Sequence, residues 1–232
     1  YLHQETIERK YTLLYTDTHC HLDFYQYDDD RAQVLRNAWD AGLAWILNPG
    51  IDLYTNQAAV ALADNYPGKI FAAVGIHPNF GKPWTADLLG ILKDQASRPN
   101  VVAIGEIGLD YYRQHTPFEQ QRLMLNEQLS LAAELGLPVI IHNRNATENL
   151  VEILGSWHQS LVMNSHPLVN RPGVLHSFSA DLQTAQSVIE KNFLIGISGP
   201  VTLKNAEDRK TITQQIPPEH ILLETDSPYL TP

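Results

Sequence analysis

The chain has little cysteine, little positive charge and no long hydrophobic run. Cys20 is the only cysteine among 232 residues, which excludes a disulfide framework and favours a reducing, cytoplasmic location. No stretch approaches the roughly 20 apolar residues of a membrane-spanning helix, so we expect no membrane partner. The first residues lack a basic region followed by an apolar core, and we expect no signal peptide there.

Positive charge is scarce, because 16 Lys and Arg residues stand against 26 Asp and Glu residues and the net charge is −10. A protein that coats duplex nucleic acid needs a basic face to displace counterions, and this composition argues against one. An enzyme that holds one or two phosphates at a cationic centre is still possible, since bound metal ions would neutralise part of the acidic charge.

Repeats, low-complexity tracts and long Gly/Ser linkers are also missing, so nothing marks a domain boundary. We therefore expect residues 1–232 to form a single domain and to act as a monomer. Apolar residues make up 44% of the chain, which suffices for a sizeable core. The length fits an α/β barrel, a fold that often takes about 200–250 residues.

Short apolar, β-branched runs alternate with longer stretches of helical periodicity. The runs lie at 11–17, 44–50, 69–78, 101–110, 137–144, 173–179, 193–199 and 220–228. Helices are predicted near 29–41, 53–65, 84–96, 117–135, 145–160, 180–190 and 205–214. Near-continuous apolar runs are typical of parallel strands buried on both faces. Eight strands and seven helices predict a (β/α)8 TIM barrel; the alternative, an open doubly wound sheet, rarely needs eight such strands.

Two details of this pattern can be checked. In the clearest helix, Thr116 fits the N-cap, Pro117 the first turn and Gly136 the C-cap. No eighth helix follows the last strand, although the row Ile221–Leu222–Leu223 must turn at least one apolar side chain outward. We expect the natural polypeptide to continue beyond Pro232 into a helix that packs between the first and eighth strands.

Ligand-type residues stand where the predicted strands end. The stretch "LYTDTHCHLDF" (14–24) alternates Asp17, His19, His21 and Asp23, which would share one face of a strand, although a polar loop could also contain them. Other strands end at His77, Glu106, His142, His176 and Asp226. Active sites of such barrels lie at this end. The remaining histidines, which are His3, His115, His158, His166 and His220, are interpreted as surface residues.

This many imidazoles and carboxylates exceed what one tetrahedral zinc ion uses, and they suit a site for two divalent ions. Glu106 is the best bridge, because its carboxylate has two oxygens and its strand lies between the two groups of ligands. Asp226 is expected to hold the attacking water and accept its proton. The ions could be magnesium, manganese or zinc.

Six segments together resemble the TatD-type metal-dependent deoxyribonucleases of the amidohydrolase superfamily. They are "DTHCHLDF", "GIHPNF", "GEIGLDYYR", "IHNRN", "HSFSA" and "ETDSPYL", in the family's order and spread over nearly the whole chain. The resemblance implies a TIM barrel that uses divalent ions to hydrolyse DNA phosphodiesters at the ends of DNA chains, often as a 3′–5′ exonuclease. Some related members are reported as aminoacyl-tRNA deacylases.

The resemblance also implies a role for each residue. His19 and His21 would bind the first ion with Asp226, Glu106 would bridge, and His142 and His176 would bind the second. His77 and Arg144 would face the substrate phosphate, for which a guanidinium is chemically suited. The alternative for Arg144 is a surface ion pair. Asp17 and Asp23 would fix histidine tautomers or would serve as turn or cap residues.

Three features depart from the family pattern. The family continues into a basic loop and a final helix, segment 156–173 is longer than usual, and Ala180 stands where glycine is common. Two other functions are alternatives. An amide or ester hydrolase, such as a cyclic amidase or deacylase, is less favoured because the fifth run contains no lysine to bridge the ions. A non-catalytic metal-binding barrel would be expected to have lost ligands, and none is missing.

Overall fold

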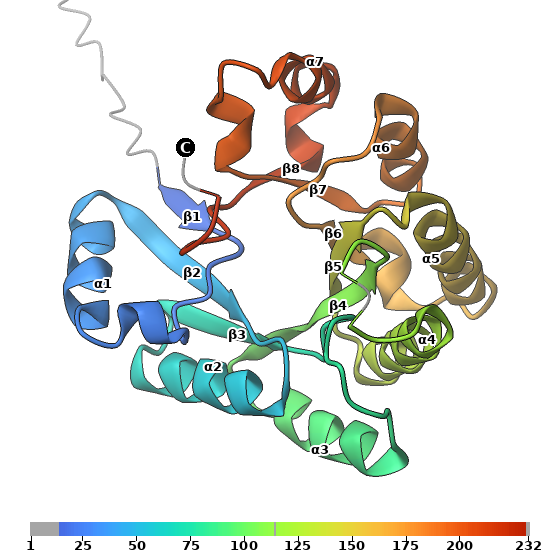
Figure 1. The fold of residues 1–232 in the computed structure, drawn as a ribbon, viewed down its shortest axis with the longest axis horizontal. Helices are drawn as coiled ribbons and strands as arrows, with labels where there is room; N and C mark the ends of the chain where they lie inside the picture. Colours follow the sequence, from blue (N-terminus) through green and yellow to red (C-terminus); the bar gives the residue numbers. More distant parts are fainter. Residues whose placement is uncertain (1–13, 114, 231–232) are drawn as a thin grey trace, which may run out of the picture.

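The computed structural model describes residues 14–113 and 115–230, and these residues form one parallel sheet in the order β1 to β8 (Figure 1). The strands are β1 (Tyr15–Asp17), β2 (Leu43–Pro49), β3 (Ile70–Val74), β4 (Val101–Asp110), β5 (Val139–Arg144), β6 (Gly173–Leu175), β7 (Leu194–Ile197) and β8 (Ile221–Leu223). The sheet curls into a nearly closed barrel, because Thr18 donates to the Leu223 carbonyl and Cys20 bridges Ser227 in parallel. The predicted single-domain TIM barrel is confirmed.

Seven α-helices surround this barrel in the described part of the chain (Figure 1). They are α1 (Arg31–Asp40), α2 (Leu53–Asn65), α3 (Ala86–Ala96), α4 (Phe118–Leu135), α5 (Thr147–Met163), α6 (Leu182–Ile189) and α7 (Glu207–Gln215). Four short 3-10 helices are η1 (Tyr25–Tyr27), η2 (Pro167–Asn170), η3 (Gly199–Thr202) and η4 (Pro218–His220). The long segment before β6 is accommodated by an extended α5 and by η2. None of the described helices is long and apolar enough to cross a membrane.

Most predicted boundaries lie within a few residues of the observed ones. Residues 11–13 of the first predicted strand lie outside the described residues. The predicted N-cap of α4 is wrong, because Pro117 holds that position and the Thr116 hydroxyl accepts a hydrogen bond from the Gly81 amide instead, at 2.9 Å. Gly136 ends the helix in the left-handed conformation, with φ 68°, as expected.

Side chains of the strands alternate between two apolar clusters. One cluster fills the barrel and contains Ala73, Ala103, Ile140 and Val174, with Leu47, Leu194 and Leu222 packed against it. Their sequence neighbours, such as Ile104 and Ile141, join the larger cluster shared with the helices. Period-two alternation therefore gives each strand one face toward the interior and one toward the helix layer.

The outer face beside β1 and β8 is open. Leu223 is 57% exposed and Tyr15 is 50% exposed. A cavity of about 350 Å³ lies there, and its lining includes Val34, Leu35 and Leu43. The helix expected beyond Pro232 lies outside the described residues and stays a prediction.

Truncation of neighbouring leucines in β8 measures how open this face is. We expect Leu222→Ala to lower the free energy of unfolding by on the order of 2 kcal/mol, because Leu222 packs inside the barrel. Leu223→Ala should cost less than about 0.5 kcal/mol in the 232-residue chain. Urea unfolding of both variants checks this. Equal losses would show that another segment or a second chain buries Leu223 in solution.

Candidate active site

The structure brings the predicted ligands together at the carboxyl-terminal mouth of the barrel. His19 and His21 follow β1, His176 follows β6, and Asp226 follows β8. Glu106 lies in β4, and its carboxylate reaches both sides of the cluster. It lies within 3.6 Å of an imidazole nitrogen of each of five histidines, which are His19, His21, His77, His142 and His176.

The two oxygens of Glu106 contact different groups of imidazoles. Oε2 lies 3.4 Å from His19 Nε2 and 3.6 Å from His21 Nε2. Oε1 lies 2.9 Å from both His142 Nδ1 and His176 Nε2. A carboxylate divided in this way between two ligand sets has the geometry of a bridge.

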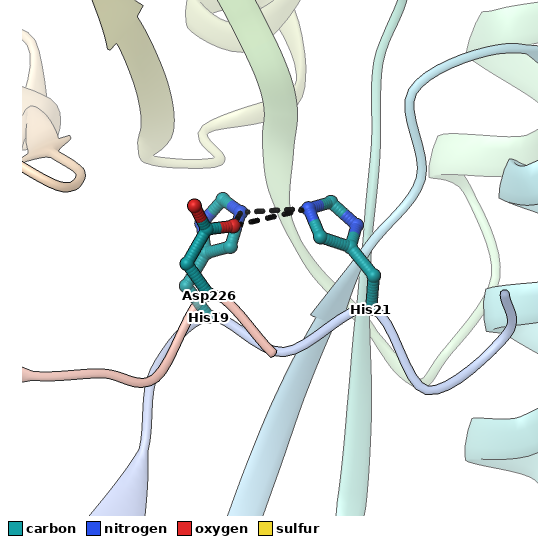
Figure 2. Close-up of side chains that lie close together, drawn as sticks. All are labelled: His19, His21 and Asp226. Atoms are coloured by element: carbon teal, nitrogen blue, oxygen red, sulfur yellow. Dashed lines mark hydrogen bonds and ion pairs between the residues drawn. The ribbon is translucent and has the colours of Figure 1, made fainter. Parts of the chain in front are cut away.

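The first ligand set lies beside β1 and β8 (Figure 2). Asp226 Oδ1 is 3.7 Å from His19 Nε2 and 3.6 Å from His21 Nε2, and those two nitrogens are 3.1 Å apart. The Asp226 amide donates to the His19 carbonyl at 2.8 Å, which fixes the turn that carries the carboxylate. Two imidazole nitrogens this close to one another and to a carboxylate fit a shared cation.

Hydrogen-bond and ion-pair partners orient His21 and His142. His21 Nδ1 lies 3.0 Å from the Pro49 carbonyl and donates to it, so Nε2 is the nitrogen that a cation would bind. Burial disfavours a charged His21, but Asp226 and Glu106 raise the pKa of the ring, and a proton on Nε2 faces these carboxylates when no cation is bound. His142 Nε2 lies 3.4 Å from Asp110 Oδ2, and its Nδ1 lies 2.9 Å from Glu106 Oε1. Burial disfavours a charged His142, but the two carboxylates raise the pKa of the ring. Contacts of this kind orient metal-binding histidines and raise their basicity.

His77 has the opposite arrangement. Its Nδ1 accepts a hydrogen bond from the Asn79 amide at 3.0 Å, so in the neutral ring the proton lies on Nε2. Nε2 is 3.5 Å from Glu106 Oε1. Burial and the neighbouring His142 lower the pKa of His77, and the ring therefore stays neutral near pH 7. His77 thus offers an N–H donor to the mouth as a neutral ring, whereas the neighbouring carboxylates raise the pKa values of His21 and His142.

Asp110 is a site residue that the sequence reasoning missed. It is buried and accepts hydrogen bonds from the amides of Tyr112 and Arg113 and from the Asn79 side chain. These bonds and His142 lower the pKa of Asp110 although its burial opposes ionisation. The carboxylate is therefore charged and fixed beside His142. The segment "GEIGLDYYR" contains Asp110, but nothing in the sequence indicates which histidine it contacts.

Asp17 and Asp23 contact backbone and amide groups rather than histidine ring nitrogens in the described structure. Asp17 accepts from the amides of His19 and Thr225 and from the Thr225 hydroxyl, which ties β1 to the segment after β8. Asp23 exchanges two hydrogen bonds with Asn48, which lies in β2. The turn role proposed for these residues therefore describes them better than the tautomer role.

Glu224 is a second missed residue. Its buried carboxylate accepts a hydrogen bond from the Ser177 amide, next to His176. Gly196 of β7 makes room for it, because a Cβ there would lie 2.4 Å from Glu224 Oε2. Burial raises the pKa of Glu224 to about 7, although His176 and the Ser177 amide favour its charged form. Glu224 thus ties the end of β8 to the turn after β6.

The electrostatics of the cluster centre on one ion pair. Burial disfavours a charged Glu106, but the imidazoles of His176, His77 and His142 outweigh burial and hold its pKa well below the usual value. Burial likewise disfavours a charged His176, yet Glu106 raises the pKa of that imidazole to about 9. His19 is different, since burial and cationic His176 lower its pKa to about 4. Without a bound ion, a proton on His176 therefore balances Glu106.

The donor set fits divalent cations. Three overlapping groups have ligand atoms within 4.8 Å of one another, and these are His19–His21–Asp226, His19–Glu106–His176 and His77–Glu106–His142. The overlap arises because the rings of His19 and His176 stack at 4.0 Å. The contacts of the two Glu106 oxygens separate the candidate ligands more clearly than these overlapping groups do. His19, His21 and Asp226 lie on one side, and His142 and His176 lie on the other. His77 is set apart because its inward nitrogen carries a proton.

Arg144 ends β5 at the same mouth but stays exposed. Its guanidinium lies 4.0 Å from the ring centroid of Tyr112, in a cation–π contact. Arg144 forms none of the ion pairs found in the described part of the chain, so the surface ion pair considered as its alternative role is not observed. The cation is held beside the mouth and its donors can reach an incoming anion.

The other histidines have mixed surroundings. His115 is exposed, as interpreted, and His3 lies outside the described residues. His158, His166 and His220 are half-buried rather than fully on the surface. His166 caps η2, since its Nδ1 accepts from the Leu168 amide at 3.2 Å. None of these three belongs to the cluster at the mouth.

A TIM barrel with imidazoles and carboxylates gathered at the carboxyl ends of its strands has the design of a metal-dependent hydrolase. Comparison with known proteins agrees. The family model described as TatD related DNase matches residues 16–232. The metal-dependent hydrolase YabD of Bacillus subtilis is 37% identical over 93% of this chain and 81% of its own length. The 3′-5′ ssDNA/RNA exonuclease TatD of Erwinia tasmaniensis is 34% identical over 89% of this chain and 77% of its own.

A solved structure of a family member has the same fold. The TatD homologue YjjV from Escherichia coli superposes with a TM-score of 0.83 and 34% identity, covering 93% of this chain and 80% of that one. The chain belongs to the TatD-related DNase family of metal-dependent hydrolases.

Metal binding should displace a proton from the cluster. His176, with a pKa of about 9, is protonated at pH 7, and a protonated imidazole cannot bind an ion. Raising the pH toward 9 removes this proton, so the apparent affinity for Mn²⁺ should rise by up to about tenfold per pH unit and then level off. Calorimetry at pH 7 in buffers of different ionisation enthalpy should show proton release. An affinity that stays constant from pH 6.5 to 8.5 would contradict this electrostatic picture.

Glu106→Gln should weaken the whole centre. The amide removes the negative charge between the two ligand sets and leaves one fewer oxygen ligand, so we expect metal affinity to fall by roughly 10–100-fold for at least one ion. Turnover should fall by on the order of a hundredfold. Titration with Mn²⁺ measures the binding, and Glu152→Gln on the exposed face of α5 is the matched control. Wild-type turnover in Glu106→Gln at saturating metal would refute a bridging role.

Proposed function

We propose that this protein hydrolyses phosphodiester bonds of DNA, at free 3′ ends of single strands, with two divalent cations at the barrel mouth. The observation that carries the proposal is the division of Glu106, whose Oε1 and Oε2 contact separate imidazole sets. His19, His21 and Asp226 would hold one ion, His142 and His176 the other, and Glu106 both. Such ions lower the pKa of water and stabilise negative charge on a phosphoryl group.

Asp226 is the proposed proton acceptor. Burial raises its pKa, but hydrogen bonding to His21 and the charge of His176 outweigh burial and lower it below the usual value. The carboxylate is therefore ionised at neutral pH and able to position a water molecule through one oxygen. Asp226 is only partly buried, so water and substrate can reach it.

His77 and Arg144 are the proposed phosphate-binding residues. The Asn79 amide holds His77 in the tautomer whose Nε2–H points into the mouth, which suits donation to a phosphate oxygen. Arg144 is held over Tyr112 with its donors free. A guanidinium can bind two phosphate oxygens at once. Together the two residues would fix the scissile group beside Glu106.

The acidic composition favours ends and single strands over long duplexes. With a net charge of −10, the chain has little means of holding an extended phosphate backbone, so binding must come from the metal centre and local contacts. The 3′-5′ ssDNA/RNA exonuclease from Erwinia tasmaniensis supports this substrate class. The single free cysteine is compatible with the cytoplasm, where we propose that the protein acts as a monomer.

Oligonucleotides that differ only in their ends test the proposal. We expect linear single-stranded DNA with a free 3′ hydroxyl to be shortened stepwise in the presence of Mg²⁺ or Mn²⁺. Closed circular single strands and duplexes should persist, since they offer no end. Denaturing gels of 5′-labelled substrate report the products. Rapid cleavage of closed circles would contradict the exonuclease assignment, and hydrolysis of aminoacyl esters alone would favour the deacylase alternative.

A further inference from the structure

Phe24 and Tyr229 form an aromatic wall at the mouth, beside His19, His21 and Asp226. The proposed hydrolysis gives these two rings no role. The Phe24 ring stacks on the His21 ring at 4.5 Å with the planes 15° apart. Tyr229 meets Phe24 edge to face at 6.0 Å. Tyr229 is 51% exposed although it lies one ring away from a buried ligand. An exposed aromatic ring at this place offers a free face on which a flat ligand can stack.

Both aromatic residues are tied to the ligands by short turns. The Phe24 amide donates to the His21 carbonyl at 3.2 Å, and the Tyr229 amide donates to the Asp226 carbonyl at 2.9 Å. Each ring therefore keeps a set position relative to a residue of the metal centre. Arg31 makes the Phe24 turn firmer, because its guanidinium donates to the carbonyls of Leu22 and Phe24.

The charge around this wall excludes one kind of ligand. Arg31 is occupied by those carbonyls and by an ion pair with Asp28, and the exposed residues Asp28, Asp29 and Asp30 follow the wall. A continuing phosphate backbone would be repelled there. An uncharged flat ring would not be, and bases of every type stack on aromatic side chains. The surroundings therefore favour a nucleobase at the end of a chain.

We infer that Tyr229, supported by Phe24, is a stacking subsite for the terminal nucleobase of a single strand whose phosphate lies at the metal centre. The inference rests on the proposed function and specifies its substrate. The subsite recognises a ring and not a sequence, so it would accept any base. It also gives affinity that depends little on salt, which an acidic protein otherwise lacks.

Variants of one tyrosine test the subsite. Tyr229→Ala should raise KM about tenfold for a single strand with an ordinary 3′-terminal nucleotide and should leave an abasic 3′ terminus unchanged. Tyr229→Phe keeps the ring and should behave like the wild type. Tyr15→Ala is the matched control, because Tyr15 is equally exposed, at 50%, but begins β1 at the opposite end of the barrel. Equal losses on both termini would overturn the inference, and so would no loss.

A binding measurement separates this inference from the proposed function. The probe is an oligonucleotide with 2-aminopurine as its last base and a phosphorothioate as its last linkage, which slows cleavage. Stacking on Tyr229 should quench its fluorescence in the wild type and in Tyr229→Phe, but not in Tyr229→Ala. Quenching without any cleavage of ordinary DNA would sink the exonuclease proposal and keep the subsite. Cleavage without quenching would do the reverse.

Discussion

The charge of Glu106 is the constraint on which the mouth of the barrel depends. A buried carboxylate is costly unless it is paired and hydrogen-bonded. Here imidazoles surround it, and in the absence of metal a proton on His176 supplies the balancing charge. Removing the carboxylate would leave His142 Nδ1 and His176 Nε2, which lie 3.3 Å apart, without the oxygen that both of them contact. The geometry of the ligands and the charge of Glu106 therefore determine each other, and the same arrangement prepares the site for cations.

The barrel supplies the convergence that this arrangement needs. Parallel strands all end at one mouth, so residues far apart in the sequence, such as His19 and Asp226, become neighbours. The contacts that close the sheet also build the site, because Asp17 binds the Thr225 amide and hydroxyl where β1 meets the end of β8. Glycine helps at Gly196, where the missing side chain admits Glu224. The contacts that close the barrel between β1 and β8 thus also place His19, His21 and Asp226 beside one another.

The barrel and the convergence of polar residues at its mouth could be predicted from the sequence for a geometric reason. Parallel strands with alternating helices leave few topologies, and polar residues at the ends of apolar runs must meet at the mouth, as His142 and His176 do. The contacts of individual side chains could not be predicted in the same way. Thr116 was predicted to cap α4 but binds Gly81, and Asp110 was not expected to contact His142. Such contacts join segments whose spacing in the sequence carries no periodic signal.

Contacts with backbone groups and with a carboxylate explain how histidine could serve both as a metal ligand and as a phosphate donor in the same cluster. The Pro49 carbonyl accepts a hydrogen bond from His21 Nδ1, and the Asp110 carboxylate lies 3.4 Å from His142 Nε2. The other nitrogen of each ring, which faces Glu106, is therefore the one that a cation would bind. The Asn79 amide does the reverse at His77 and leaves a proton pointing inward. In the proposed site, the partner of the second ring nitrogen would therefore distinguish a metal ligand from a phosphate donor. Since Asn79 also donates to Asp110, a single residue helps to set both His77 and His142. The metal-binding and substrate-binding halves of the proposed site are in this way coupled through one asparagine.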